Sequence, residues 1–400
     1  MRFPRRRKPF LRSDFKRSEE NTEDMTVTVI YGGKSGEHEI SLLSAAAVAR
    51  SIDPKNTVNL VAVTKKGRWF LQPDSELERI KADEGAPLRI IEDETREVSL
   101  IPGGGAGGAL KVAGEFLPGD VVFPVLHGTF GEDGTIQGLF EMLDVPYVGC
   151  AVLGSALAMD KEKTKTVLAR AGIPVVPGIC VRRSELADWS RYDKILERAR
   201  EELGFPLFVK PCAAGSSDGA SLAKDLPHLN GAIMEAFNWD DKILIEKAIN
   251  AREIECSVTG NPTIDDDSCG AERLTAYGPG EIAPKHDFYD YDAKYNDPDG
   301  AELLIPARLS EERLEEIRAL AKKAFSALDL AGLSRVDFFI DKDTDKLYLN
   351  EINTMPGFTR ISMFPKMCAA LGLDFTSLTN LLIDAALARF RKTRNLQTSR

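Results

Sequence analysis

The sequence contains few of the residues that build metal centres from soft ligands. Its 400 residues include only four histidines, and its six cysteines stand singly, with no CxxC pair. This composition argues against a zinc site. Isolated thiols are typical of a reducing compartment, so a cytoplasmic protein is expected.

Long apolar runs and an excess of basic residues are also missing. No apolar run approaches the roughly 20 residues that a membrane-spanning helix needs. The net charge is −10, which argues against non-specific binding to nucleic acid, since such binding needs a basic surface. Neither a membrane nor a nucleic-acid partner is therefore expected. A content of 43% hydrophobic and 28% charged residues is typical of a globular protein, here of two or three domains.

The first 24 residues differ from the rest. They contain eight basic and five acidic residues, and they lack the apolar segment of a secretory signal. Such a segment could bind an acidic surface, but short charged termini are usually loosely structured. Residues 1–24 are therefore predicted to be a disordered basic extension, or to follow from an upstream start codon with Met25 as the working start.

Apolar periodicity predicts an α/β arrangement in the first part of the body. The expected elements are a strand at 25–33, a helix at 41–50, and strands at 59–64, 67–71 and 120–126. Alternating strands and helices indicate a parallel sheet that is covered on both faces. Residues 72–115 are polar and glycine-rich. They are expected to form a surface hairpin or loop, because no helix follows at the distance that a phosphate-binding loop requires.

The second part of the body is predicted to mix strands, helices and loops. The expected helices lie at 159–172, 227–237, 310–328 and 374–391. The expected strands lie at 206–211, 242–249, 252–260, 334–341 and 346–353, and a long loop is expected at 278–300. Boundaries near 154 and 245 give domains at 25–154, 155–245 and 246–392, with a tail at 393–400.

The last two expected strands place oxygen ligands together. Arg335, Asp337 and Phe339 alternate with three apolar residues and should share a face. In the next strand Glu351 and Asn353 are expected to share a face with Leu347 and Leu349. A short turn makes an antiparallel hairpin the expected pairing, so Asp337, Glu351 and Asn353 can converge. Three oxygen ligands favour a hard cation such as Mg²⁺, although a solvated polar strand face gives the same pattern.

Two further segments suggest a nucleotide. The loop KPCAAGSSDGAS leaves a strand and offers backbone N–H groups to phosphates, with Lys210 as a point charge. It is not a Walker A loop, and an ordinary Gly/Ser turn is the alternative. In IEKAI, Glu246 and Lys247 stand beside a backbone edge at Ala248 and Ile249 that could read an adenine. A strand with a solvated acid–base pair would look the same.

Eight motifs in a fixed order are more specific than any one of them. They are GGKSGEHEIS, LHGTFGEDGTIQG, GSALAMDK, KPCAAGSSDG, IEKAI, FYDYDAKY, RVDFF and NEINTMPGFT. In this order, over residues 25–392, the sequence strongly resembles the D-alanine–D-alanine ligase family. The resemblance implies a three-domain ATP-grasp fold of the α/β (α+β) class, with an N-terminal parallel-sheet domain and ATP held between two further subdomains. It also implies a homodimer.

The resemblance implies a reaction as well. Two D-alanines would be joined to D-alanyl-D-alanine through an acyl phosphate, for peptidoglycan precursor synthesis. ATP would be the co-substrate, with two magnesium or manganese ions held by Asp337, Glu351 and Asn353. The phosphates would be bound by Lys161 and Lys210, and by Lys294 when the loop at 278–300 closes as a lid over the acyl phosphate.

The remaining roles concern the nucleoside, the substrates and the oxyanion. Glu246 would bind the adenine amino group with Lys247, Ala248 and Ile249 around the base, and Glu253 would bind the ribose. Arg335 and the Gly357 N–H would face the oxyanion. Glu37 would receive the ammonium of the first D-alanine, with His127 in the same pocket and with Ser216 and Tyr295 linked to Glu37. Ser362, with Met363 beside it, would bind the carboxylate of the second D-alanine.

Three other functions fit parts of the pattern. A D-alanine–D-lactate ligase is disfavoured by Tyr295, and a ligase for another amino acid by Glu37, Ser216, Tyr295 and Ser362 together. A non-catalytic nucleotide-binding protein is disfavoured because the expected metal ligands are present. One departure from the family pattern is Asp218, which adds negative charge to the expected phosphate loop.

Overall fold

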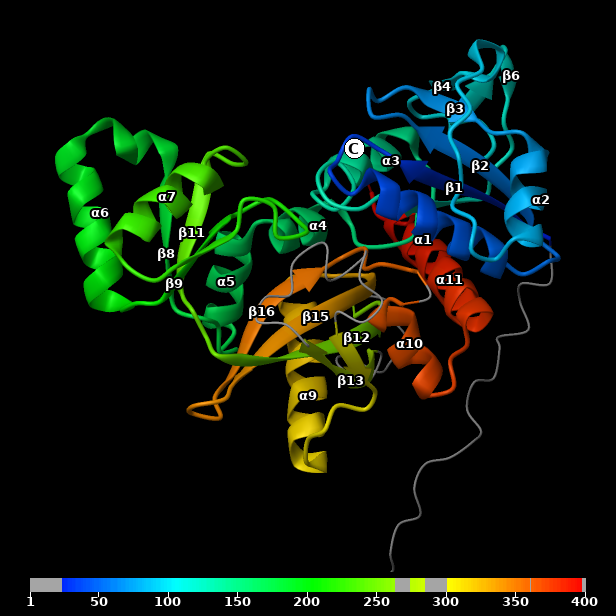
Figure 1. Ribbon diagram of the computed structural model, residues 1–400. Coiled ribbons are helices and arrows are strands. Elements are labelled where there is room, and N and C mark those ends of the chain that lie inside the picture. Colours follow the sequence, from blue (N-terminus) through cyan, green and yellow to red (C-terminus); the bar gives the residue numbers. More distant parts are fainter. Residues whose placement is uncertain (1–23, 263–273, 285–300, 360, 398–400) are drawn as a thin grey trace, which may run out of the picture.

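The computed structural model describes residues 24–262, 274–284, 301–359 and 361–397 (Figure 1). Lys294 and Tyr295 lie outside the described residues, as does the extension at 1–23. The observed sheets are built in succession along the chain, and strands of the second and third sheets, together with loops next to the first, supply the candidate site.

The first sheet has the order β3-β2-β1-β7. Its strands are β1 (Thr26–Gly32), β2 (Thr57–Val63), β3 (Trp69–Leu71) and β7 (Val121–Val125). β1 pairs in parallel with β2 and β7, so the predicted parallel sheet is confirmed, and β3 joins β2 antiparallel. Helices α1 (His38–Ser51) and α11 (Phe375–Arg394) pack on this sheet, and apolar side chains from all of them form one core cluster.

The prediction of a simple hairpin or loop at 72–115 was wrong. This stretch contains α2 (Asp74–Ala82), a 3₁₀ turn at Glu94–Arg96, and a three-stranded sheet of β4 (Val98–Leu100), β5 (Leu110–Val112) and β6 (Glu115–Phe116). The helix escapes a periodicity test because one of its two buried residues is a carboxylate, Glu76, which pairs with two arginines. Helices α3 (Thr135–Leu143) and α4 (Val152–Met159) follow β7 and were not predicted either.

The second sheet is antiparallel and has the order β10-β9-β11-β8. It consists of β8 (Gly178–Arg182), β9 (Leu207–Pro211), β10 (Ser221–Ala223) and β11 (Lys242–Lys247). Helix α5 (Lys161–Arg170) precedes it in the chain, and a 3₁₀ turn (Arg183–Ala187), α6 (Trp189–Glu202) and α7 (Leu226–Ala236) pack on its outer side (Figure 1). The loop at 212–220 leaves β9 and turns towards the centre of the molecule.

The third sheet has the order β14-β13-β12-β15-β16. Its strands are β12 (Ala251–Gly260), β13 (Thr275–Pro284), β14 (Ala301–Leu304), β15 (Gly332–Asp341) and β16 (Leu347–Asn353), with helices α9 (Glu311–Ala327) and α10 (Met363–Ala370). Ser310 caps α9, as predicted. The loop expected at 278–300 is wrong for residues 278–284, which belong to β13, and residues 285–300 lie outside the described residues.

The hairpin of β15 and β16 contains a bulge that corrects one prediction. β15 alternates as expected, with Val336, Phe338 and Ile340 buried. In β16, however, the register shifts by one residue, so that Asp337 faces Glu351 while Phe338 faces Leu349. The extra residue, Asn350, reverses the alternation. Leu347 and Leu349 therefore point into the core, and Glu351 and Asn353 lie on the opposite face from them.

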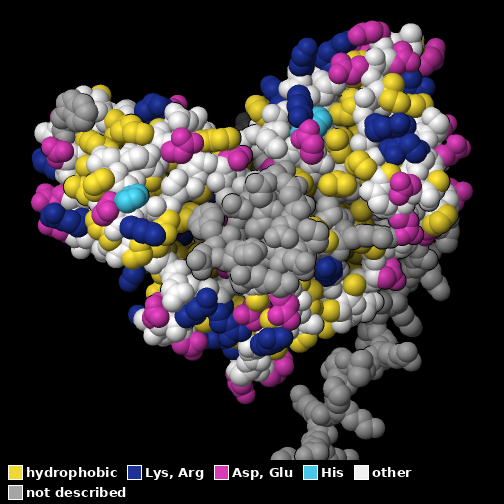
Figure 2. Space-filling view, viewed as in Figure 1, with side chains coloured by type: hydrophobic (Ala, Val, Ile, Leu, Met, Phe, Trp, Pro, Cys, Tyr) yellow, Lys and Arg dark blue, Asp and Glu magenta, His cyan; other side chains and the backbone are white. Residues whose placement is uncertain are grey.

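The helices of the described residues can be compared with the length and apolarity that a membrane span needs. No single helix there is both long and apolar enough to cross a membrane, and α10 and α11 reach that length only across a bend of 103°. Basic and acidic side chains are interspersed over the face drawn in Figure 2. The domain boundaries near 154 and 245 stay predictions.

Candidate active site

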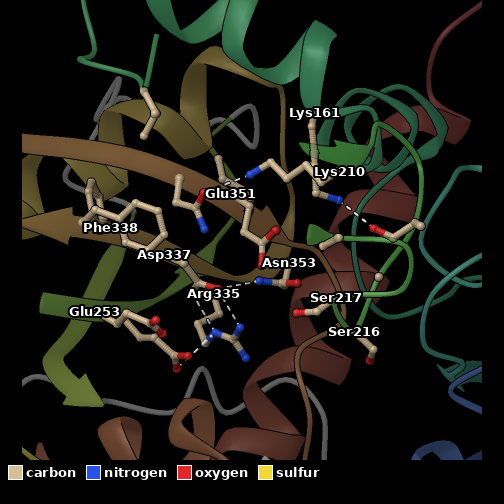
Figure 3. Close-up of a pocket in the computed structure, with 18 of the residues that line it drawn as sticks. Lys161, Lys210, Ser216, Ser217, Glu253, Arg335, Asp337, Phe338, Glu351 and Asn353 are labelled. Carbon is tan, nitrogen blue, oxygen red and sulfur yellow. Dashed lines mark hydrogen bonds and ion pairs between the residues drawn. The ribbon is translucent and has the colours of Figure 1, made fainter. Parts of the chain in front are cut away.

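A cavity of about 680 Å³ is lined by residues of the second and third sheets and by residues of α1 and of the loops that follow β1 and β7. Most of the residues predicted from the sequence line it, namely Glu37, His127, Lys161, Lys210, Ser216, Glu246, Lys247, Ala248, Ile249, Glu253, Arg335, Asp337, Glu351, Asn353 and Gly357. Two described residues that were expected there, Ser362 and Met363, are not among the lining residues. Figure 3 shows the cavity with ten of its lining residues labelled.

Asp337, Glu351 and Asn353 form one corner of the cavity. Their positions follow from the hairpin register, which sets Asp337 opposite Glu351 and Arg335 opposite Asn353. Arg335 donates from Nε and Nη2 to the two oxygens of Asp337, at 2.8 and 2.6 Å, and Asn353 Nδ2 donates to Asp337 Oδ2 at 2.9 Å (Figure 3). Despite burial, these carboxylates raise the pKa of Arg335 well above its usual value.

Arg335 has a second acidic partner that the sequence reading missed. Glu255 of β12 is buried, and its Oε2 lies 3.1 Å from Arg335 Nε. It lies opposite Asp337 in the β12–β15 pairing. The signal was present in the segment REIE, because Glu253 and Glu255 are two residues apart on one strand and therefore share a face.

The donor set at this corner fits a hard cation. Two carboxylates and one carboxamide offer only oxygen ligands, and three protein ligands leave coordination positions for phosphate oxygens. Within the described ranges, no group of three or more His, Cys, Asp or Glu residues is placed to hold a metal ion.

Two lysines meet one carboxylate at the opposite corner. Glu246 Oε2 lies 2.6 Å from Lys210 Nζ, and Glu246 Oε1 pairs with Lys165 Nζ. Lys210 also donates to Asn350 Oδ1 at 3.2 Å. Although burial opposes charge, the two lysines lower the pKa of Glu246, and Glu246 and Glu351 together raise the pKa of Lys210. Lys165 was not predicted, although it is one helical turn from Lys161.

The loop at 212–220 and the start of α5 form the wall between these corners. Asp160 caps α5 by accepting from the Lys163 N–H at 3.0 Å, which places Lys161 at the first helical position. Lys161 Nζ donates to the carbonyl oxygen of Ala214 in the loop, at 2.6 Å (Figure 3). Lys161 is therefore directed at the loop that the sequence suggested for phosphates.

Ser216 connects this loop with the first sheet. Its backbone has φ +48°, and that of Ser217 has φ +63°, a conformation that non-glycine residues adopt at a cost. Ser216 Oγ donates to Glu37 Oε1 at 2.5 Å, which is the contact expected from the resemblance. Asp218 also lines the cavity, and burial, with Glu37 nearby, raises its pKa.

His127 holds a loop of the third sheet. Its Nδ1 lies 2.8 Å from the Met355 carbonyl oxygen and its Nε2 lies 2.9 Å from Ser44 Oγ. A carbonyl can only accept, so Nδ1 carries the proton and Nε2 accepts from Ser44. Ser44 Oγ in turn accepts the Phe358 N–H at 3.2 Å. Burial lowers the pKa of His127, which agrees with a neutral ring.

Glu132 completes this contact from the other side. Its carboxylate accepts the N–H of Gly128 at 2.9 Å and the N–H of Met355 at 3.0 Å. Burial, reinforced by the Glu37 charge, raises the pKa of Glu132 to about 8. The Met355 peptide is thus held at both its N–H and its carbonyl, which fixes the segment that leads to Gly357.

Ser362 lies behind Gly357 rather than in the cavity wall. Its Oγ accepts the Thr359 N–H at 3.1 Å and lies 2.8 Å from Thr359 Oγ1. A Cβ on Gly357 would lie 2.7 Å from Ser362 Oγ, so a larger residue here would force the Ser362 hydroxyl to move. Met363 is buried in the core beneath β13. In this structure the Ser362 hydroxyl stabilises its own turn.

Some of the backbone groups expected to bind adenine already form hydrogen bonds within the protein. The Lys247 N–H donates to the Pro177 carbonyl at 3.1 Å, and the Ala248 N–H donates to the Pro206 carbonyl at 3.0 Å. A base at this edge would therefore be read by other polar groups of the 246–249 stretch. Glu253 lines the cavity on the neighbouring strand (Figure 3).

Comparison with known proteins finds similarity over almost the whole chain. Residues 26–150 match the family model described as D-ala D-ala ligase N-terminus, and residues 167–384 match the one described as D-ala D-ala ligase C-terminus. The D-alanine–D-alanine ligase of Treponema denticola is 54% identical over 376 residues, which are 94% of this chain and 100% of that protein. The ligase of Treponema pallidum, strain Nichols, is 46% identical over 93% of this chain and 90% of its own length.

Solved structures show the same similarity. The D-alanine–D-alanine ligase from Coxiella burnetii superposes with a TM-score of 0.76 at 35% identity, covering 93% of this chain and 96% of that one. The VanG D-Ala:D-Ser ligase from Enterococcus faecalis superposes with a TM-score of 0.74 at 32% identity, covering 91% of this chain and 100% of that one.

Proposed function

The chain belongs to the D-alanine–D-alanine ligase family, and we propose that it joins two D-alanines to D-alanyl-D-alanine with ATP, for peptidoglycan precursor synthesis. The resemblance read from the eight motifs is confirmed, and so is the ATP-grasp fold. The observation that carries the proposal is the single cavity that joins the Lys210 corner, the Asp337 corner and Glu37.

The first chemical step would activate a carboxylate, which is a poor electrophile. The carboxylate of the first D-alanine attacks the γ-phosphorus of ATP, and ADP leaves with the bridging oxygen. Lys161 and Lys210 line the cavity where they can bind the phosphates, and Lys294 is proposed to join them. Two magnesium or manganese ions held by Asp337, Glu351 and Asn353 would supply further positive charge to the phosphate oxygens.

Glu37 is proposed to hold the first D-alanine by its ammonium group. The Ser216 hydroxyl fixes one carboxylate oxygen of Glu37, so the carboxylate has a defined direction. Tyr295 is proposed to join this pair. The site also leaves little room near Glu37, since a Cβ on Gly128 or Gly215 would lie 2.5 or 2.7 Å from its Oε2. This favours a small first substrate.

The second step would form the peptide bond. The amine of the second D-alanine, having lost a proton, attacks the acyl carbon, and phosphate leaves as the acyl C–O bond breaks. The tetrahedral oxyanion between these events needs donors already in place. Arg335 and the Gly357 N–H are proposed for this role, and Ser362 with Met363 for the end of the second substrate. Glu246 to Ile249 and Glu253 are proposed to bind adenosine. His127 lines the same cavity, but its contacts make it a support for Met355.

The proposed reaction is tested by product identification. The protein is mixed with ATP, Mg²⁺ and equal concentrations of D-alanine, D-serine and D-lactate, and the products are determined by mass. D-alanyl-D-alanine is the expected main product, with release of one phosphate per dipeptide. D-serine is the second candidate acceptor, because one similar structure is a D-Ala:D-Ser ligase. No D-alanine-dependent phosphate release would refute the proposal.

Two properties remain as proposals from resemblance and composition. The protein is proposed to form a homodimer and to act in the cytoplasm. Gel filtration with light scattering tests the first, and fractionation of the source cells tests the second.

A further inference from the structure

Lys165 is a buried cation next to the cavity. It lies on α5, one turn after Lys161, and pairs with Glu246 Oε1, while Lys210 pairs with Glu246 Oε2. The side chains of Lys165, Glu246 and Lys210 are 9%, 3% and 10% exposed. Among the described residues, Glu246 and Lys210 line the cavity and Lys165 does not. Lys165 therefore stands behind the carboxylate, away from any ligand.

The arrangement solves a problem that one lysine could not. A buried carboxylate is strongly destabilised when its only partner leaves, because it then stays charged without compensation. If Glu246 had Lys210 alone, Lys210 could not turn to a phosphate without leaving such a charge. Here each oxygen of Glu246 has its own lysine, so one lysine can leave while the other remains.

Of the two lysines, Lys210 is the one whose surroundings allow it to break its ion pair with Glu246. Lys210 borders the open cavity and has a second, neutral contact with Asn350 at 3.2 Å. Lys165 is held in a helix, and burial lowers its pKa to about 8, although Glu246 raises it. Lys161, on the same helix face, donates to the neutral carbonyl of Ala214.

We propose that Lys165 is a positioning residue that keeps Glu246 paired when Lys210 turns from Glu246 to the phosphates of ATP. The inference rests on the proposed ATP site. It makes Lys165 necessary for phosphate recognition although Lys165 does not touch the nucleotide. In this role the effect of Lys165 depends on the charge of Glu246, whereas a cation that attracted the phosphates directly would act without Glu246.

The proposed role of Lys165 is measured by comparing the binding of a nucleotide, ATP, with that of its nucleoside, adenosine. Affinities for ATP with Mg²⁺ and for adenosine are determined by calorimetry for the wild type and for Lys165→Met, which keeps the length of the side chain without its charge. ATP should bind at least tenfold more weakly to the variant, because Lys210 then stays on Glu246. Adenosine should change by less than twofold, since Glu246 keeps its place. Lys163→Met, on the exposed side of the same helix, is the matched control and should change neither.

The Glu246→Gln background distinguishes the proposal from direct attraction. Without the charge of Glu246, Lys210 is already released, so adding Lys165→Met should change ATP affinity by less than twofold. A tenfold loss in that background would show that Lys165 acts on the phosphates directly, and would overturn the proposal. Unchanged ATP affinity in Lys165→Met, or equal losses for ATP and adenosine, would overturn it as well. If Lys165→Met fails to fold, the comparison in the Glu246→Gln background decides alone.

The wild type provides a separate check of the premise. If it binds ATP no more tightly than adenosine, the proposed ATP site fails, whatever Lys165 does.

Discussion

Arg335 and any cation must share Asp337. In this structure the guanidinium holds both oxygens of that carboxylate, and Asn353 donates to one of them. A bound cation would displace part of this pairing. Glu255 offers Arg335 another anion at 3.1 Å, so the guanidinium can keep a compensated charge while Asp337 turns. Glu351 lies opposite Asp337 in the hairpin and carries the other carboxylate of the expected cation site, so the cation site can be tested there.

Replacing Glu351 by Gln should weaken metal-dependent turnover. The amide has nearly the same size but no charge, so the fold should survive while affinity for a divalent cation falls. We expect a rise in the Mg²⁺ concentration needed for half-maximal turnover and at least a tenfold loss at ordinary Mg²⁺. Turnover is measured against Mg²⁺, with thermal melting as the check on folding. Asp343→Asn, in the exposed turn of the same hairpin, is the control and should behave as wild type. Wild-type turnover of Glu351→Gln would show that the cation site is assigned wrongly.

Ser44 should matter for turnover although it does not line the cavity. Its hydroxyl bonds His127 and the Phe358 N–H, so Ser44→Ala leaves both without this partner in a buried place. The expected loss of stability is about 1–3 kcal/mol, and kcat should fall because Phe358 adjoins Gly357. Ser51→Ala is the control, since Ser51 is buried on the same helix and bonds Thr379 instead. Equal kcat for the two variants would contradict this role.

At the scale of elements, the sequence predicted features that depend on local pattern and missed those that depend on a partner element. β15 was predicted because its alternation is local. The bulge at Asn350 was not, because a register shift is defined only against the partner strand. The metal corner was still predicted, since Glu351 and Asn353 are two residues apart and lie beyond the bulge. Glu76 hid α2 for a related reason: its burial is stabilised by Arg89, which lies outside the helix.

Glu76 makes the packing of α2 sensitive to acid. Arg79 and Arg89 outweigh burial and lower its pKa from 4.5 to about 2. A carboxyl whose pKa is lower in the folded state stabilises the fold above its unfolded pKa, and this contribution is lost as pH falls from about 4.5 towards 2. Glu76→Gln should therefore cost about 3 kcal/mol at pH 7, and the difference from wild type should shrink below pH 4.5.

Denaturant unfolding at a series of pH values measures this difference. Glu78→Gln, on the exposed side of α2, is the control and should leave the free energy of unfolding nearly unchanged. A difference between Glu76→Gln and wild type that stays constant down to pH 3 would refute the assignment.

At the scale of the whole molecule, the site is assembled from parts that no local pattern joins. The residues that border the cavity were predicted because the ordered motifs resemble those of a known family, and the resemblance implies their roles. The motifs did not predict Lys165, Glu255 or Glu132, whose roles depend on partners in other helices, strands or loops. The placement of Ser362 behind Gly357 likewise follows from the turn that follows β16, and not from the spacing of the motif.

Removing residues 1–24 should leave turnover and melting temperature nearly unchanged. The first pairings of the fold involve Met25, whose N–H bonds Asn56 and whose carbonyl accepts from Thr57. Activity and thermal melting of the shortened chain measure this. A chain that begins after Gly32 lacks β1 and should not fold, which makes it the contrasting variant. A loss of more than a few degrees on removing 1–24 alone would show that the extension belongs to the fold.

The position of α11 has a consequence for folding during synthesis of the chain. The helix packs on the first sheet and on α1, where Leu378, Leu382 and Ile383 enter the same core as β1. More than 300 residues separate the end of β2 at Val63 from Phe375, where α11 begins. During translation α1 can cover its part of the first sheet early, but the part that α11 covers stays exposed until this last helix leaves the ribosome. Chains that stop before Phe375 keep that part uncovered and become clients for chaperones and proteases, whatever the state of their cavity.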